Sequence, residues 1–184
     1  TSAYGVFATG GIRHPYQSII SVSDKDGKVL EKMEDSYSEV LPVNTTKIIS
    51  DILSDNVARI PTFGANSSLV IKGTDVAVKT GTTNNNKDAW TIGYSSSVVV
   101  GAWAGNNDNV PMKKGGAALA GPIWNGILNE ALKTNPGVPF VKPDEIDSNT
   151  RPILLGYWQG EDGYSNVHSI LYWIDKSNPT GLRP

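Results

Sequence analysis

The sequence predicts an α/β protein in which an antiparallel sheet is flanked by helices. Three stretches with the pattern of strands follow one another at residues 74–82, 88–94 and 97–105. Apolar residues at helical spacing come before them at residues 48–53 and after them at residues 117–132. Because sequential strands with short connections pair antiparallel, we expect a meander with the later helix lying across it.

Composition indicates an ordinary globular chain. Of its 184 residues, 39% are hydrophobic and 18% are charged. A formal net charge of -2 without a long basic run gives no electrostatic footprint for nucleic acid, and no segment has the length of a membrane span. The absence of cysteine excludes disulfides, thiolate metal sites and a cysteine nucleophile. The first residues, "TSAYGVFATGG", contain neither methionine nor a signal pattern, so we expect a fragment of a longer protein.

Residues 19–33 predict a β-hairpin. Alternating apolar residues flank Asp26-Gly27, a dipeptide that supplies positive φ in a two-residue turn. The same stretch begins like a calcium loop, but the third acidic residue and the bidentate glutamate are missing. We therefore favour a hairpin turn over a calcium site.

Two amphipathic helices are predicted. The first is expected to be capped by Asn44 or Thr45, side chains that accept hydrogen bonds from a helix N-terminus. Its expected apolar face consists of Ile48, Ile49, Ile52 and Leu53. The second covers residues 117–132, where Pro122 is tolerable only near the first turn. Its expected apolar face consists of Leu119, Ile123, Trp124, Ile127, Leu128 and Leu132.

Proline and acidic residues interrupt any period beyond Thr134. We expect a boundary near Pro139, so that residues 1–140 form one structural part and residues 141–184 form a Pro-rich linker with a C-terminal extension. Whether the extension folds back on the preceding part stays open at this point.

The segment Lys79-Thr80-Gly81-Thr82 has the chemistry of a carboxylate receptor. Lys79 supplies charge, Thr80 and Thr82 supply hydroxyl donors, and Gly81 leaves room for a ligand backbone beside the strand. Alternation along the strand places Lys79 and Gly81 on one face and the valines on the core face. Taken alone, the triplet Lys-Thr-Gly also fits an exposed edge strand followed by a loop.

The surrounding sequence favours the functional interpretation. The string "VKTGTTNNNKDAWTIGYSSSVVVGAWAGNNDN" is preceded by "AYGVFATGG" and followed by "GGAALAGPIW". In this order and spacing, about residues 1–140 resemble the C-terminal half of the transpeptidase domain of class A penicillin-binding proteins. The resemblance implies part of a penicillin-binding transpeptidase fold, which is related to that of the serine β-lactamases.

The resemblance also implies roles for individual residues. Lys79 matches the lysine that neutralises the carboxylate of the donor peptide and assists proton transfer. Thr80 and Thr82 match hydroxyls that hold the same carboxylate, and the N–H of Thr82 matches one half of an oxyanion hole. Residues 88–90 are expected to be structural, with Trp90 in the core or at the rim of the site.

The nucleophile implied by the resemblance is absent from the chain. It would be a serine in Ser-x-x-Lys, and no lysine here has serine three residues before it. Ser54-Asp55-Asn56 spells the second motif of the family, but it follows the first predicted helix and lies too close to Lys79 in sequence. Since such residues commonly end helices, we interpret this segment as structural.

The implied parent protein cross-links peptidoglycan stem peptides and is captured by β-lactam antibiotics, without cofactor or metal. It would act on the outer side of the cytoplasmic membrane, anchored through an upstream segment. His14 and His168 lie far apart in sequence and predict no metal site. A β-lactamase, a β-lactam sensor and a non-catalytic module for binding cell-wall peptides remain alternatives, and we expect this chain alone to be inactive.

Overall fold

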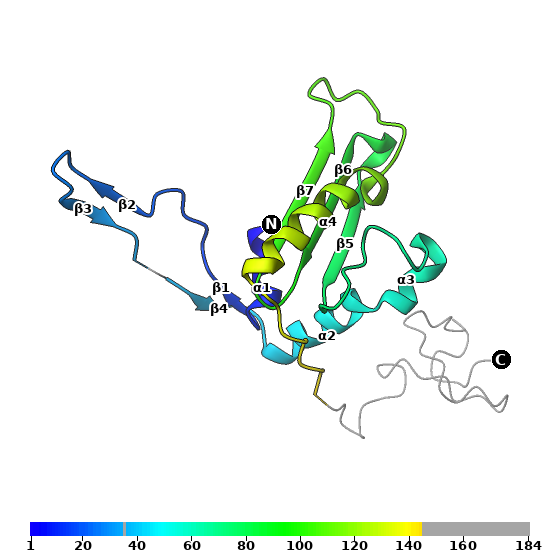
Figure 1. Cartoon of the computed structure of the whole chain (residues 1–184), viewed down its shortest axis with the longest axis horizontal. Coiled ribbons are helices and arrows are strands. Elements are labelled where there is room, and N and C mark those ends of the chain that lie inside the picture. Colours follow the sequence, from blue (N-terminus) through cyan, green and yellow to red (C-terminus); the bar gives the residue numbers. More distant parts are fainter. Residues whose placement is uncertain (35, 145–184) are drawn as a thin grey trace, which may run out of the picture. The chain divides into compact units, whose positions relative to one another are not determined.

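The computed structural model describes residues 1–34 and 36–144 (Figure 1). The chain divides into two units, Thr1–Pro143 and Asp144–Pro184, and the following description concerns the first. The extension predicted from residue 141 onward and His168 lie almost entirely outside the described residues, so the predictions about them stay predictions.

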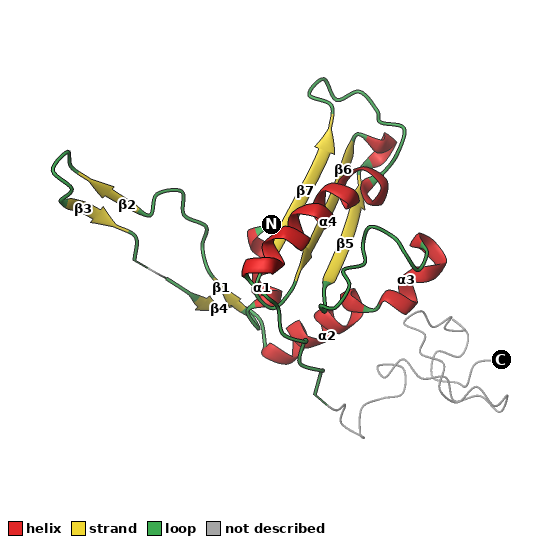
Figure 2. Cartoon of the chain, viewed as in Figure 1, coloured by secondary structure: helices red, strands yellow, loops and turns green. Residues whose placement is uncertain are grey.

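A three-stranded antiparallel sheet forms the centre of the first unit (Figure 2). Its strands are β5 (Ala77–Thr82), β6 (Asp88–Tyr94) and β7 (Val99–Gly105), and β6 lies between the other two. A serine-rich turn joins β6 to β7, where the Ser95 hydroxyl accepts hydrogen bonds from the backbone N–H groups of residues 97 and 98. The predicted meander is confirmed.

Helix α4 (Gly116–Thr134) covers one face of this sheet, as predicted (Figure 1). Its fully buried Trp124 and Leu128 pack in a common core with Val78 and Val100 of the strands. The helix starts close to the predicted position, but Pro122 lies in its second turn rather than its first. Pro122 is exposed at this position.

The opposite face of the sheet is covered at one end by α1 (Ser2–Ala8), a helix that the sequence analysis missed. The rings of Tyr4 and Phe7 pack around Tyr94 of β6, which is fully buried. Ser50 shares a 2.9 Å hydrogen bond with the Tyr94 hydroxyl. Burial raises the pKa of the Tyr94 phenol above its ordinary value, so this ring stays neutral in the core.

Helix α2 (Val43–Ser54) is present, but its predicted cap is wrong. Its predicted apolar face is half right, because Ile49 and Leu53 are partly buried. The helix begins after Pro42 without a side-chain cap, rather than after Asn44 or Thr45. Its buried residues are Thr46 and Ser50, whereas Ile48 and Ile52 are about half exposed. The physical reason is that two small hydroxyl residues allow close packing and satisfy their own hydrogen bonds, Thr46 within the helix and Ser50 with Tyr94.

The segment Ser54-Asp55-Asn56 joins α2 to a second unpredicted helix, α3 (Asn56–Phe63). The Ser54 hydroxyl donates to the carbonyl of Asp51, and the Asp55 carboxylate accepts from the N–H of Ala58. Both are capping interactions of the kind that short polar side chains make at helix ends. The geometry supports the structural interpretation of this segment.

The predicted hairpin is formed by β2 (Ser21–Ser23) and β3 (Val29–Lys32). Strands β1 (Ile12–Arg13) and β4 (Ser38–Glu39), which precede and follow the hairpin in sequence, form a second antiparallel pair. The two-residue turn is wrong. The Asp24 carboxylate accepts from the N–H groups of Asp26 and Lys28, which produces a longer loop in which Gly27, at φ +83°, takes the left-handed conformation.

Gly93 provides a test of the contact between α4 and the sheet. A Cβ at this position would lie 2.5 Å from Cζ2 of Trp124 and 2.8 Å from the carbonyl oxygen of Ala77. We expect Gly93→Ala to lower the free energy of unfolding by about 1–3 kcal/mol, because neither the buried indole nor the backbone can move freely. Denaturant unfolding of the two proteins measures the difference.

Gly126→Ala is the matched control. Gly126 lies in α4, and an added Cβ would meet no atom within 4 Å. We expect the free energy of unfolding of this variant to rise by about 0.5–1 kcal/mol, because alanine has a higher helix propensity than glycine. Equal stability of the Gly93→Ala variant and the unmodified chain would contradict the described packing.

Candidate functional site

Strand β5 has a buried face and an open face. Val76 and Val78 are 6% and 3% exposed, whereas Lys79 is exposed on the side away from α4, as predicted. Cross-strand partners share a face, so Gly81 of β5 lies in one row with Trp90 of β6 and Trp103 of β7. The open face therefore presents the Lys79 ammonium, the space left by Gly81, and two exposed indoles.

β5 is also an edge strand, because β6 is its only partner within residues 1–34 and 36–144. The N–H of Thr83 donates to the carbonyl of Asp88, and backbone groups alternate in direction along a strand. The N–H of Thr82 therefore points away from β6, toward the free edge. The carbonyls of Val78 and Thr80 point to the same side.

Two cationic side chains donate hydrogen bonds to the backbone carbonyls at this edge. Nζ of Lys79 lies 2.6 Å from the carbonyl oxygen of Thr80 and donates to it. Nη1 of Arg59, in α3, donates to the carbonyls of Leu53 and Val78, and Nη2 bonds the side chain of Asn56. Burial lowers the pKa of Arg59, while the Asp55 carboxylate opposes that shift. Arg59 thereby ties the junction of α2 and α3 to the start of the exposed edge.

The hydroxyls of Thr80 and Thr82 lie on the face opposite to Lys79. The Thr82 Oγ1 accepts a 2.9 Å hydrogen bond from the N–H of Gly116, at the start of α4. Because that oxygen already accepts, its own proton remains available for donation to a ligand. The structure thus brings Lys79 and both threonines to the same edge strand. The ammonium and the hydroxyls lie on opposite faces, so both would contact a ligand only if it lies along the edge between those faces.

The glycine pair at the start of α4, Gly115 and Gly116, allows this approach. A Cβ on Gly115 would lie 2.6 Å from Oγ1 of Thr82. A Cβ on Gly116 would lie 2.5 Å from the carbonyl oxygens of both Gly81 and Trp90. Only glycine lets the helix start this close to the site strand.

Beyond Thr82 the chain forms a tight turn. Residues Asn84–Asn86 make a short 3₁₀ helix (η1) in which Asn85 and Asn86 have positive φ. The N–H of Met112 donates to the carbonyl of Asn86 and attaches the turn to the connection before α4. A polar cleft of about 580 Å³ opens here, lined by Thr82, Thr83, Asn84, Asn85, Lys87, Asp88 and Asn109.

Asp88 connects this turn to β7. Its carboxylate accepts a 2.8 Å hydrogen bond from the Thr83 hydroxyl and a 3.0 Å bond from Nε1 of Trp103. These two bonds, led by that from Trp103, lower the pKa of the Asp88 carboxyl below its ordinary value. Asp88 is therefore an anion at neutral pH although it lies beside an expected anion site.

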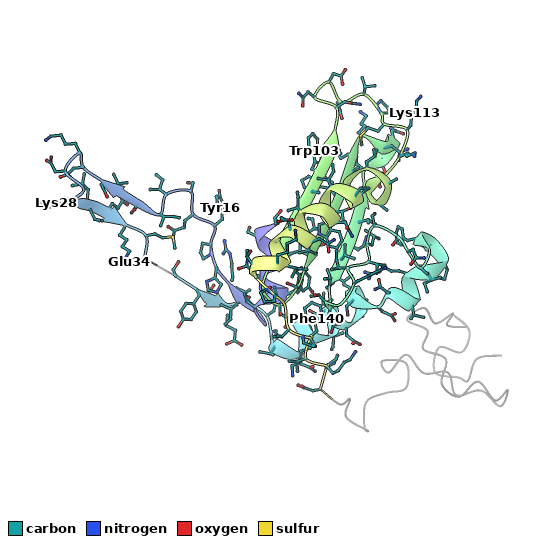
Figure 3. All side chains as sticks on the ribbon, in the orientation of Figure 1. Tyr16, Lys28, Glu34, Trp103, Lys113 and Phe140 are labelled. Carbon is teal, nitrogen blue, oxygen red and sulfur yellow. The ribbon has the colours of Figure 1, made fainter. Side chains whose placement is uncertain are left out.

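Trp90 lies at the rim. It is 40% exposed on the same face as Lys79, and its ring centroid lies 6.4 Å from that of Trp103, which is labelled in Figure 3. An added Cβ at Gly81 would lie 3.4 Å from Cβ of Trp90. This position agrees with the expected placement in the core or at the rim.

Sequence reasoning missed the residues that hold the site strand in place: Arg59, Thr83, Gly115 and Gly116. Their partners are distant in sequence, and only the double glycine before a predicted helix was a visible signal. Within residues 1–34 and 36–144, no three acidic, histidine or cysteine side chains gather as a metal site. No helix of the same described part is long and apolar enough to cross a membrane.

The chain is similar to known proteins over most of its length. It is 32% identical over 154 residues, 80% of its length, to penicillin-binding protein 1A of Neisseria gonorrhoeae. It superposes with a TM-score of 0.64 and 28% identity on the penicillin-binding protein PonA1 of Mycobacterium tuberculosis, covering 79% of this chain and 40% of that one. The chain is homologous to the class A penicillin-binding proteins.

The chain matches only a part of the N. gonorrhoeae and M. tuberculosis proteins. The chain spans about a fifth of the length of the N. gonorrhoeae penicillin-binding protein, 19%. Its fold is that of a penicillin-binding transpeptidase domain, which the D,D-transpeptidase domain of a peptidoglycan glycosyltransferase from Eggerthella lenta shares at a TM-score of 0.50 and 19% identity, over 72% of this chain and 31% of that one. No protein-family model matches the chain. The predicted family and fold are confirmed.

The candidate site offers a pH test at Asp88. Because the pKa of Asp88 is lower in the folded than in the unfolded chain, its bonds are complete above the ordinary value of 3.8 and are lost as the pH falls through the lower, folded value. We expect the Nε1–H resonance of Trp103 to be constant from neutral pH to about 4 and to shift only below it. An NMR titration, with Trp103→Phe to assign the signal, measures the midpoint. A midpoint at or above 3.8 would contradict these hydrogen bonds.

Proposed function

We propose that this chain is the anion-binding half of a D,D-transpeptidase site that cross-links peptidoglycan stem peptides. The observation that carries the proposal is the placement of the Lys79 ammonium beside the free edge of β5, next to the outward N–H of Thr82. The homology to penicillin-binding proteins supports it. In this proposal, residues 1–140 are the C-terminal portion of the transpeptidase domain and residues 141–184 are a linker and extension.

The free edge of β5 suits an extended peptide. A donor peptide lying along it would meet one outward backbone group at every second residue, as an added strand does. Lys79 would neutralise its terminal carboxylate, with the hydroxyls of Thr80 and Thr82 as further donors. Gly81 carries no side chain that would hold the peptide away from the strand. The N–H of Thr82 would then stabilise the negative charge on the attacked carbonyl.

The covalent step needs a nucleophile from an upstream part of the same protein. Its serine oxygen attacks the carbonyl of the penultimate D-alanine and forms an ester, and the terminal D-alanine leaves with the proton. An amine of a second stem peptide then attacks the ester, restores the serine hydroxyl and forms the cross-link. A β-lactam imitates the D-alanine pair and stops after the first step. This chain alone is inactive in the proposal, because it has no Ser-x-x-Lys.

The substrate sets the location. Peptidoglycan stem peptides are cross-linked on the outer side of the cytoplasmic membrane, and the parent protein would be held there by an upstream anchor. No cofactor is required, since the chemistry is acyl transfer by a serine and by general acids and bases. A non-catalytic peptide-binding module would share the edge of β5 but would lack the upstream nucleophile.

Fluorescent penicillin labelling of the intact parent protein tests the proposal. We expect Lys79→Ala to slow labelling about 100-fold or more, because a charged donor to the reacting ligand is lost. Lys79→Arg should recover part of the rate, because the charge remains but the geometry differs. Stopped labelling reactions resolved on a gel give the rates.

Lys113→Ala is the control. Lys113 is an exposed lysine in the connection before α4, labelled in Figure 3, so its removal changes the net charge equally but should leave the rate unchanged. Equal labelling of the Lys79→Ala variant and the unmodified parent would refute the role of Lys79. A parent protein that takes no label would refute the transpeptidase proposal itself.

A further inference from the structure

The turn after β5 is held by reciprocal hydrogen bonds between two residues. The Thr83 hydroxyl donates to Oδ2 of Asp88 at 2.8 Å, and the same hydroxyl oxygen accepts from the N–H of Asp88 at 2.9 Å. The backbone adds a third bond, from the N–H of Thr83 to the carbonyl of Asp88, at 3.1 Å. Thr83 directly follows Thr82, so these bonds determine the direction in which the chain leaves the site.

Asp88 also reaches across the sheet. Its Oδ1 accepts from Nε1 of Trp103, on β7, at 3.0 Å. The ring of Trp103 lies beside that of Trp90, which in turn lies opposite Gly81 in the register of β5 and β6. The contacts therefore form a closed path from Thr83 through Asp88, Trp103 and Trp90 back to the site strand.

The charge of Asp88 needs an explanation other than ligand binding. Asp88 and Thr82 line the same open depression, at the end of the strand where the proposed function places an anionic ligand, and a nearby carboxylate repels such a ligand. Solvent-exposed carboxylates have no general need for two side-chain donors. Here both oxygens are used, each by a donor from a different element, which is the arrangement of a brace.

We propose that Asp88 is a positioning residue that acts through Thr83 and Trp103 to hold the N–H of Thr82 in the direction required for acyl transfer. The proposal rests on the proposed function, and it adds a residue that makes no contact with the reacting atoms. Loss of the brace would let the end of β5 turn, and small displacements of catalytic donors are costly to rate. Binding of the ligand carboxylate, which depends on Lys79, would change less.

The test is a set of variants of the intact parent protein, each measured for its dissociation constant and its first-order acylation rate with a fluorescent penicillin. We expect Asp88→Ala to lower the acylation rate about 10- to 100-fold with a change of less than about 3-fold in the dissociation constant. Thr83→Val should resemble Asp88→Ala, and Thr83→Ser, which keeps the hydroxyl, should recover most of the rate.

A double variant shows whether the two residues act as one unit. Asp88→Ala combined with Thr83→Val should be no slower than Asp88→Ala alone by more than about 2-fold, because the same interaction is removed twice. Trp103→Phe, which loses the indole N–H, should show an intermediate loss. Asp26→Ala, in the hairpin loop, is the matched control and should acylate normally, because Lys25 is the partner of its carboxylate.

The outcomes separate the two proposals. Normal acylation by Asp88→Ala, or losses that multiply in the double variant, would overturn the positioning role. If Asp88→Ala does not fold, as judged by thermal melting, the Thr83→Val and Thr83→Ser pair decides the question, and equal rates for that pair would overturn the role as well. Absence of label on the unmodified parent would instead refute the proposed function.

Discussion

The close approach of α4 to the sheet is the constraint on which the rest of the structure depends. Trp124 can lie against β6 only because residue 93 is glycine, and the helix can begin beneath β5 only because residue 116 is glycine. Once α4 occupies this face, Val76 and Val78 become core residues. Lys79, Gly81 and the two indoles are then left on the other face, where α1 and α2 cover only the end near Tyr94.

The site follows from the polarity of an unpaired strand edge. An edge strand presents backbone groups that must be satisfied by something else, and here α3 and a lysine serve the carbonyls. Arg59 serves Val78 and Lys79 serves Thr80, while the N–H of Thr82 is directed outward. In the proposed function, this edge would receive a ligand that brings a carboxylate and an acceptor carbonyl, which is the chemistry of a peptide ending in D-alanine.

Sequence reasoning succeeded where the information was local. Alternation predicted β5, β6 and β7, and helical spacing predicted α4 with Trp124 and Leu128 in the core. Ile123 and Ile127, also predicted for the apolar face of α4, are about half exposed. Sequence reasoning failed for part of α2, because hydrophobicity selected Ile48 and Ile52 for a face whose buried members are Thr46 and Ser50. The hydroxyl of Ser50 is buried because Tyr94, 44 residues away, provides its partner, and no periodicity reveals such a pair.

For the candidate site, the sequence was enough to predict the chemical groups and their spacing: a lysine, two hydroxyls and a glycine on one strand, within a motif order that resembles a penicillin-binding transpeptidase. The tertiary structure decided which of these groups point together and what holds them. Strand alternation separates Lys79 from the hydroxyl of Thr82, and only the position of α4 shows that Gly116 engages that hydroxyl. Likewise, nothing in the sequence distinguishes Asp88 from the other acidic residues. The pairing of β6 with β7 brings Trp103 within hydrogen-bond distance of its carboxylate. The physical reason is that the sequence shows which side chains follow one another along a strand or helix. Hydrogen bonds between different strands and helices join residues that are distant in sequence, so they depend on how the whole chain packs.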